Sequence, residues 1–216
     1  MRVRMLMAAT GAAMLLAATG AGPATAGPVA ANSCEPQGPS PVIFGDAMDN
    51  VIVGTALDET IFGGPGDDII DGGGGNDIIF GGAGDDTING NWGQDRIDGE
   101  AGDDAVLGDE CADVLTGNDG NDAVDGGPGQ DVVLGGDGPD DLAGNEDDDQ
   151  IDGQAGDDVA DGGFGDDDLR GGAGDDLLRG NAGDDRIDGQ AGFDTGNGGP
   201  GVDVCSAATE VLILCP

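Results

Sequence analysis

Aspartate recurs at one fixed place in a nine-residue spacing that runs through most of the chain. Counting from Gly45, glycine opens 18 successive nonapeptides as far as Gly198; position four is Gly in 14 of them and position six is Asp in 16. Calcium prefers six to eight oxygen ligands, and carboxylates supply charged ones. Glycine adopts positive φ without steric cost, so backbone carbonyls in such a loop can turn towards one centre. The spacing therefore indicates a series of calcium sites, one kind of loop repeated many times.

The elements that position these loops follow from the same repeat. Positions one to six are Gly-rich and polar, which predicts a turn. Positions seven to nine predict a three-residue strand whose central side chain points away from its two neighbours. Position eight is apolar in 17 of 18 units and is mostly a branched aliphatic residue. Stacked strands of this kind predict an all-β solenoid with a narrow apolar ladder as its core.

Other repeat architectures disagree with the pattern. Collagen needs Gly at every third residue, whereas Gly here stands at positions one and four but not seven. Helical solenoids need runs longer than these Gly-dense units allow. An EF-hand loop beginning at Asp184 would need Glu at its twelfth position, where Thr195 stands.

The unit Gly-Gly-x-Gly-x-Asp-x-apolar-x resembles the hemolysin-type, or RTX, calcium-binding nonapeptide. Residues 63–71 (GGPGDDIID) and 171–179 (GGAGDDLLR) are typical copies, and the resemblance covers residues 45–206. It implies a right-handed parallel β-roll in which two nonapeptides make one coil, giving about nine coils. It also implies multiple Ca2+ ions in the turns, between loops two repeats apart.

The resemblance further implies which residues bind the metal. Twelve ligand-type aspartates lie in regular loops: Asp68, Asp77, Asp86, Asp95, Asp104, Asp122, Asp131, Asp140, Asp158, Asp167, Asp176 and Asp185. Four more stand at position six of altered loops: Asp113, Asp149, Asp194 and Asp203. In the first two of these, Cys111 and Asp147 replace the position-four Gly, which weakens the case for calcium there. A single Asp of this kind would be interpreted as a solvated turn residue, but the repeated array favours ligands.

Composition agrees with a need for cations. The chain carries 45 acidic residues, six basic residues, no His and a formal net charge of -39, with 47 Gly and only 3% aromatic residues. Such a chain is too acidic and too poor in apolar groups to fold unaided. We therefore expect it to be expanded without calcium and to fold on binding it. The same charge excludes nucleic acid as a partner, since phosphates need Lys or Arg.

The N-terminus predicts a cleaved secretion signal over residues 1–26. Arg2 and Arg4 precede an apolar run from Met5 to Ala18, and residues 24–26 (ATA) form a small-residue cleavage site. A transmembrane helix is the alternative, but the run is short and ends in a Gly/Pro-rich stretch. No second apolar span follows, so we expect a secreted protein with no transmembrane segment after cleavage.

The four cysteines predict two disulfides. An even number in an exported chain allows three connectivities. Cys205 and Cys215 are close in sequence, which favours a local bond and leaves Cys34 with Cys111. We expect residues 27–44 to be a cap or linker, residues 45–206 the repeat roll and residues 207–216 a C-terminal cap.

Enzyme activity is not expected. The chain has no His or Lys, no Gly-x-Ser-x-Gly elbow and no segment outside the repeats long enough for a catalytic domain. The alternative function is a calcium-dependent adhesion or surface scaffold, with an unidentified cell-surface or matrix partner. Its binding face would use outward residues at positions seven and nine: Thr60, Phe62, Ile78, Phe80, Val114, Val132 and Leu134.

Overall fold

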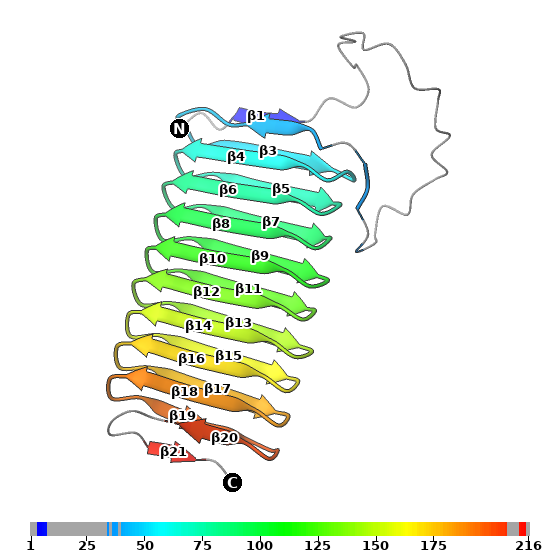
Figure 1. Cartoon of the computed structure of the whole chain (residues 1–216). Coiled ribbons are helices and arrows are strands. Elements are labelled where there is room, and N and C mark those ends of the chain that lie inside the picture. The colour runs from blue at the N-terminus through cyan, green and yellow to red at the C-terminus, as the bar shows by residue number, and fades with distance from the viewer. Residues whose placement is uncertain (1–3, 8–33, 35, 39, 207–211, 215–216) are drawn as a thin grey trace.

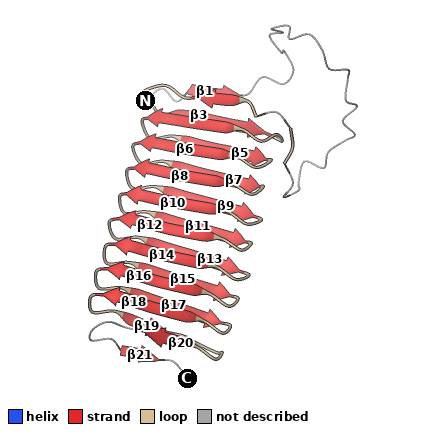
Figure 2. Cartoon of the chain, viewed as in Figure 1, coloured by secondary structure: helices blue, strands red, loops and turns tan. Residues whose placement is uncertain are grey.

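Two parallel β-sheets face each other and form a single roll (Figure 1). The computed structural model describes residues 4–7, 34, 36–38, 40–206 and 212–214. Every regular element in these residues is a strand (Figure 2). Successive coils stack in sequence order along the roll. Among the described residues there is no helix of the length and apolar character needed to cross a membrane.

The strands alternate between the sheets. Sheet A runs in the order β1 (Arg4–Met7), β3 (Asn50–Thr55), β5 (Ile69–Gly74), β7 (Thr87–Trp92), β9 (Ala105–Glu110), β11 (Ala123–Pro128), β13 (Asp141–Glu146), β15 (Val159–Phe164), β17 (Leu177–Ala182), β19 (Thr195–Asn197), β21 (Leu212–Leu214). Sheet B runs in the order β2 (Val42–Phe44), β4 (Thr60–Pro65), β6 (Ile78–Ala83), β8 (Arg96–Ala101), β10 (Val114–Asp119), β12 (Val132–Asp137), β14 (Gln150–Ala155), β16 (Asp168–Ala173), β18 (Arg186–Ala191), β20 (Val204–Ser206).

The register shows that one coil consists of two nonapeptides. Val114 of β10 pairs with Val132 of β12, and Ile69 of β5 pairs with Thr87 of β7. Both offsets are 18 residues, so side chains at the same repeat position stack above one another on the same sheet. The predicted all-β parallel roll is confirmed.

The core is the predicted ladder of position-eight side chains. They come alternately from the two sheets and meet between them, each with 0–2% of its surface exposed: Ile52, Ile61, Ile70, Ile79, Ile88, Ile97, Val106, Leu115, Val124, Val133, Leu142, Ile151, Ala160, Leu169, Leu178 and Ile187. Ile43 and Cys205 pack against its two ends. Burying an Ile or Leu side chain contributes about 1.5–3 kcal/mol, but the core is only one side chain wide.

The strands are longer than the sequence predicts. Most span six residues, from position seven to position three of the next unit, so only positions four to six turn. Pairing skips position one: Thr116 and Asn118 of β10 both have partners in β12, whereas Gly117 between them has none. The expectation of a turn over positions one to six was wrong because the chain bends at position one and then resumes pairing.

Position two contributes to this bend through positive φ. Where Gly is replaced by Asn there, the side chain reaches back to an outward Asp of the preceding coil. Asn91 (φ 71) donates from Nδ2 to Asp71 Oδ1 at 2.9 Å, and Asn145 (φ 82) to Asp125 Oδ1 at 2.6 Å. Asn tolerates the left-handed region better than most residues, and the hydrogen bond ties adjacent coils together.

The N-terminal arm is attached to the side of the roll. Cys34 forms a disulfide with Cys111, as predicted, with the two Cα atoms 5.9 Å apart. The Gln37 backbone N–H donates to Asp58 Oδ1 at 2.8 Å. The arm then enters β2, which extends the nine-residue register by one strand. Cys205 is also disulfide-bonded, while its expected partner Cys215 lies outside the described residues.

Candidate metal centre

The position-six aspartates form two rows, one along each edge of the roll where the chain passes between the sheets. Each row holds eight stacked side chains, because each Asp immediately precedes a strand of one sheet. The row leading into sheet A consists of Asp68, Asp86, Asp104, Asp122, Asp140, Asp158, Asp176 and Asp194. The row leading into sheet B consists of Asp77, Asp95, Asp113, Asp131, Asp149, Asp167, Asp185 and Asp203.

One oxygen of each carboxylate links two coils. The Asp68 backbone N–H donates to Asp86 Oδ1 at 2.7 Å, and the Asp77 N–H donates to Asp95 Oδ1 at 2.7 Å. The same bond repeats at every step of both rows as far as Asp185 N–H to Asp203 Oδ1, at 3.0 Å. These bonds fix the side-chain direction, and they place like charges in register at about the 4.8 Å spacing of strands.

The second oxygen has no donor. In all sixteen position-six aspartates Oδ2 is buried without a hydrogen-bond partner. The residues from Asp68 to Asp194 have only 1–3% of their surface exposed. Buried polar atoms are almost always paired, and a charged one left unpaired is costly. Each of these oxygens therefore needs a proton, a water or a cation.

Position-one glycine creates the space that this oxygen faces. A Cβ atom on Gly72 would stand 2.8 Å from Asp77 Oδ2 and 3.0 Å from the carbonyl oxygen of Gly90 in the next coil. In the other row, a Cβ on Gly81 would stand 2.5 Å from Asp86 Oδ2 and 2.7 Å from the Gly99 carbonyl oxygen. Any side chain at position one would fill this space, which explains why all 18 units begin with Gly. Two acceptor oxygens face the same small region.

Burial dominates the electrostatics of both rows. It raises the pKa of Asp77 and Asp113 to about 9 and that of Asp149 to about 8, against the hydrogen bond from the preceding coil, which lowers the pKa. Neighbouring carboxylates raise these pKa values further.

The same cause raises the pKa of twelve further aspartates in the two rows. Burial raises the pKa to about 7 for Asp86, Asp95, Asp104 and Asp140, and to about 6 for Asp131, Asp167 and Asp176. It also raises the pKa of Asp68, Asp122, Asp158, Asp185 and Asp194. A cation placed beside these oxygens would reverse the effect, because a bound ion favours the charged carboxylate.

The first two units differ from the rest in the way that their sequences predict. Asn50 Oδ1 accepts the Asp46 backbone N–H at 2.7 Å, so this side chain is satisfied within its own loop. Both carboxylate oxygens of Glu59 accept hydrogen bonds from Thr55, one from its N–H and one from its hydroxyl. Neither residue leaves the unpaired oxygen that every position-six Asp leaves, so the first coil differs from the later coils at the candidate metal position.

The altered loops keep the same geometry as the regular ones. Cys111 and Asp147 adopt φ 89 and φ 76 in place of the position-four Gly. Asp113 and Asp149, two residues further on, still bury an unpaired Oδ2, as do Asp194 and Asp203. Asp113, Asp149 and Asp194 therefore match the twelve regular aspartates, whereas Asp203, in the last unit, is only half-buried.

The donor set fits calcium. Within the described residues no group of three or more acidic or cysteine side chains converges on one point. The oxygens that face one another in these loops are a carboxylate oxygen and a backbone carbonyl oxygen, and such an all-oxygen set suits a hard cation such as Ca2+.

Sequence reasoning missed a second row of hydrogen bonds in the same loops. At position five, most Asp and Asn side chains accept a backbone N–H from the next coil: Asp85 N–H donates to Asp67 Oδ1 at 3.2 Å, and Asp103 N–H to Asp85 Oδ1 at 3.0 Å. These side chains are exposed, unlike those at position six. Asp or Asn at position five of many units was the available signal.

Comparison with known families agrees with this geometry. The model of the RTX calcium-binding nonapeptide repeat matches residues 44–79, 53–88, 72–106, 101–133, 134–169, 161–196 and 170–205. The chain belongs to this family and is a calcium-binding repeat protein. A search of curated proteins finds no match to the chain.

Without calcium the roll should be more stable in acid than at neutral pH. The raised pKa values mean that the folded roll keeps protons which the unfolded chain has already released. Its stability should be greatest below about pH 4, the ordinary range for Asp, and should fall as the pH rises through the folded values of about 6 for Asp131 and about 9 for Asp113. Urea unfolding in chelator between pH 4 and pH 9 measures this; stability that rises over that range would contradict it.

Asp86→Asn should have opposite effects with and without calcium. Asn keeps the oxygen that accepts the Asp68 N–H but removes a buried negative charge. In chelator at pH 7.5 it should stabilise any folded roll by about 1–3 kcal/mol; in excess calcium it should destabilise the protein.

The matched control for this variant is Asp85→Asn, which changes the exposed neighbour in the same loop and keeps its acceptor oxygen. It should change the free energy of unfolding by no more than about 0.5 kcal/mol, both in chelator and in excess calcium. Equal behaviour of the two variants in calcium titrations followed by circular dichroism would show that position six has no special role.

Proposed function

We propose that calcium ions bind in both rows, between stacked loops, and that the sixteen position-six aspartates are their side-chain ligands. The proposal rests on one observation, the sixteen buried Oδ2 atoms with no hydrogen-bond partner. Family membership supports calcium as the ion. The carbonyl oxygens facing the same spaces support sites shared between the side chain and the backbone.

Calcium binding and folding are coupled in this proposal. An ion that binds only the folded chain adds to its stability by linkage. The sites exist only when coils are stacked, because each space lies between one loop and the loop 18 residues further on. The apolar ladder is one side chain wide and cannot by itself offset the ordering of 47 glycines and the repulsion of a charge of -39.

We further propose that the protein is secreted, with residues 1–26 removed, residues 27–44 as an arm, residues 45–206 as the roll and residues 207–216 as a C-terminal cap. An oxidising exterior suits the Cys34–Cys111 disulfide. Strand β1 lies within residues 1–26, so cleavage would leave β3 as the first strand of sheet A. Strand β21 pairs with β19 and extends that sheet at its other end. No catalytic activity is expected.

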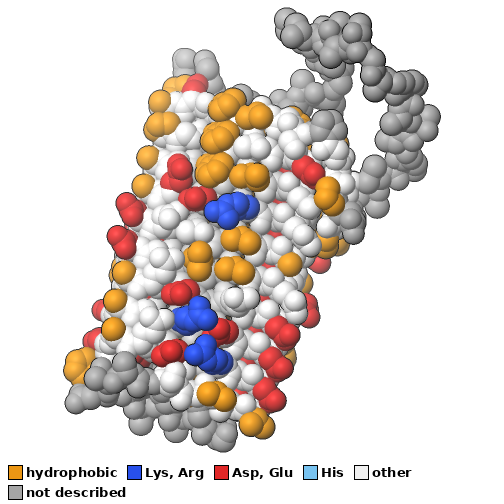
Figure 3. Space-filling view, in the orientation of Figure 1, with side chains coloured by type: hydrophobic (Ala, Val, Ile, Leu, Met, Phe, Trp, Pro, Cys, Tyr) orange, Lys and Arg blue, Asp and Glu red, His pale blue; other side chains and the backbone are white. Residues whose placement is uncertain are grey.

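A second candidate function, as a calcium-dependent scaffold or adhesion protein, is favoured by the outer face of sheet B. The rings of Phe44, Phe62 and Phe80 stack in a column, with centroids 5.1 and 5.0 Å apart and planes 8° apart. Phe44 and Val42 are 63% and 54% exposed. Figure 3 shows hydrophobic side chains gathered towards this end of the face.

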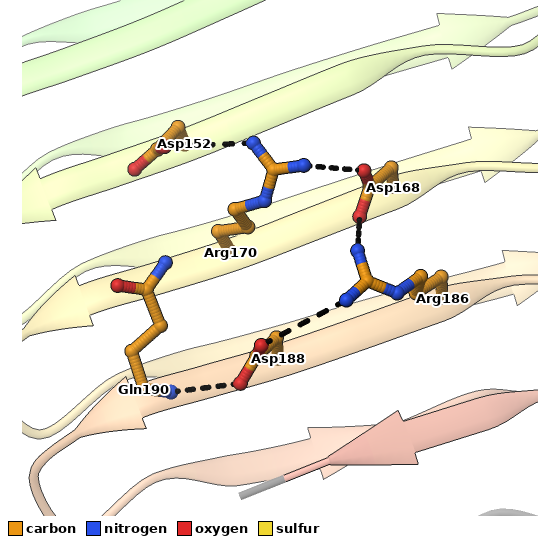
Figure 4. Close-up of polar contacts among 6 residues, drawn as sticks. All are labelled: Asp152, Asp168, Arg170, Arg186, Asp188 and Gln190. Atoms are coloured by element: carbon orange, nitrogen blue, oxygen red, sulfur yellow. Dashed lines mark hydrogen bonds and ion pairs between the residues drawn. The ribbon is translucent and has the colours of Figure 1, made fainter. Parts of the chain in front are cut away.

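The other end of the same face is charged and self-paired (Figure 4). Arg170 contacts Asp168 at 2.7 Å and Asp152 at 4.0 Å, and Arg186 contacts Asp168 at 3.1 Å. These exposed pairs each contribute little to stability, but they join three neighbouring strands. An apolar partner would therefore dock on the phenylalanine end of the face.

Calcium should convert the chain from an expanded to a compact state. In excess chelator at pH 7.5 we expect little β-sheet signal in circular dichroism and a large hydrodynamic radius. Calcium should raise the β-sheet signal and reduce the hydrodynamic radius cooperatively. An equal concentration of magnesium should do neither, since Mg2+ demands octahedral geometry and keeps its water ligands. An unchanged β-sheet spectrum in chelator would refute the proposal.

The scaffold candidate predicts that binding to cell-envelope or matrix preparations needs both calcium and the phenylalanine column. Phe44→Ser with Phe80→Ser should abolish binding while leaving the calcium-induced circular dichroism signal intact. The control is Val204→Ser in β20, an apolar residue that is 61% exposed at the charged end of sheet B and outside the proposed binding face. Binding that survives the phenylalanine changes would exclude this face.

A further inference from the structure

A shallow pocket of about 320 Å³ lies outside both metal rows, at the edge of sheet A where β7, β9 and β11 end. Its lining residues are Asn91, Trp92, Asp109, Glu110 and Pro128. They occupy positions two and three of three successive coils, which face outward rather than into the metal loops. The calcium-binding role proposed above uses none of their side chains.

At positions two and three, these residues carry side chains where the preceding coil has glycine. The preceding coil has Gly73 and Gly74 at the same two positions, and Gly74 pairs with Trp92. Trp92 in turn pairs with Glu110, and Asn91 pairs with Asp109. Trp92, which is half-buried, therefore lines the same pocket as the two acidic residues of the following coil.

Neighbouring bonds hold the pocket in place. Asn91 is tied to the preceding coil through Asp71. The backbone N–H of Cys111 donates to the Pro128 carbonyl at 2.9 Å, directly beside the disulfide to Cys34. The walls thus come from three coils that are joined to one another and to the N-terminal arm.

The charge of the pocket is negative and uncompensated. No basic residue lines it, and the ion pairs found among the described residues involve neither Asp109 nor Glu110. An aromatic face beside carboxylates attracts organic cations through the ring quadrupole and through charge. The field of a molecule with a net charge of -39 raises the local concentration of cations at every such site.

We propose that this pocket binds an organic ammonium group, with the cation over the face of Trp92 and beside the carboxylates of Asp109 and Glu110. Calcium can use the oxygens of the two carboxylates but gains nothing from the Trp92 ring, whereas an organic ammonium group uses both. A neutral sugar could stack on the indole but would gain nothing from the two charges. The site rests on the proposed function only in that the roll must be folded.

Trp92 is the only tryptophan of the chain, so its fluorescence reports on the pocket directly. The full-length, oxidised protein in saturating calcium would be titrated with tetramethylammonium chloride, with NaCl at equal ionic strength and with glucose. We expect a saturable change with tetramethylammonium alone. Asp109→Asn with Glu110→Gln should weaken it about tenfold, within the range of cation–π and charge contributions.

Glu146→Gln is the matched control, because Glu146 stands at the same repeat position two coils further on and outside the pocket. It should leave the affinity unchanged. Circular dichroism of each sample separates this proposal from the calcium proposal, since a folded roll that shows no tetramethylammonium response refutes only the former. A response to glucose but not to tetramethylammonium, or equal weakening by Glu146→Gln, would also overturn it.

Discussion

The roll depends on the state of sixteen buried carboxylate oxygens that have no hydrogen-bond donor. Leaving a charged oxygen buried and unpaired costs several kcal/mol, and here the cost recurs along both edges of the roll. A proton would neutralise the carboxylate, but a neutral side chain would not require an aspartate at this position. A divalent cation keeps the charge and turns the repulsion between stacked loops into coordination. A divalent cation at these oxygens accounts together for the acidity of the chain, its nine-residue period and its membership of a calcium-binding family.

The two carboxylate oxygens of each position-six aspartate have different roles. Oδ1 accepts a backbone N–H from the preceding coil and fixes the direction of the side chain, as in the bond from Asp68 to Asp86. Oδ2 then has only one place to point, the space left by the missing side chain at position one, as at Gly81. The glycine that opens every unit and the aspartate present in 16 of the 18 units therefore act together in one feature. The outward positions are free to vary, and both the phenylalanine column and the Trp92 pocket lie there.

Much of the fold and of the candidate metal site could be predicted from the sequence because the same residue pattern recurs over 18 units. The core ladder and the distinct residues of the first two units followed from residue type and period. The parallel coils followed from the resemblance to the RTX repeat, and the Cys34–Cys111 bond from assigning the two C-terminal cysteines to each other. The six-residue strands could not be predicted, because position one looks like turn chemistry although the chain resumes pairing immediately after it. Strand β2 was missed because four prolines precede it within residues 27–41, although Ile43 precedes Ile52 by one period. The pocket at Trp92 required knowing that positions two and three of adjacent coils lie side by side.

A crystal structure of the calcium-loaded protein, with anomalous diffraction recorded at a wavelength where calcium scatters, would test the central claim most directly. The account predicts two rows of calcium peaks along the edges of the roll, each peak within coordination distance of a position-six Oδ2 and of backbone carbonyl oxygens. A folded roll whose position-six oxygens are instead satisfied by protein donors or water, with calcium absent or bound only at the exposed position-five side chains, would contradict it.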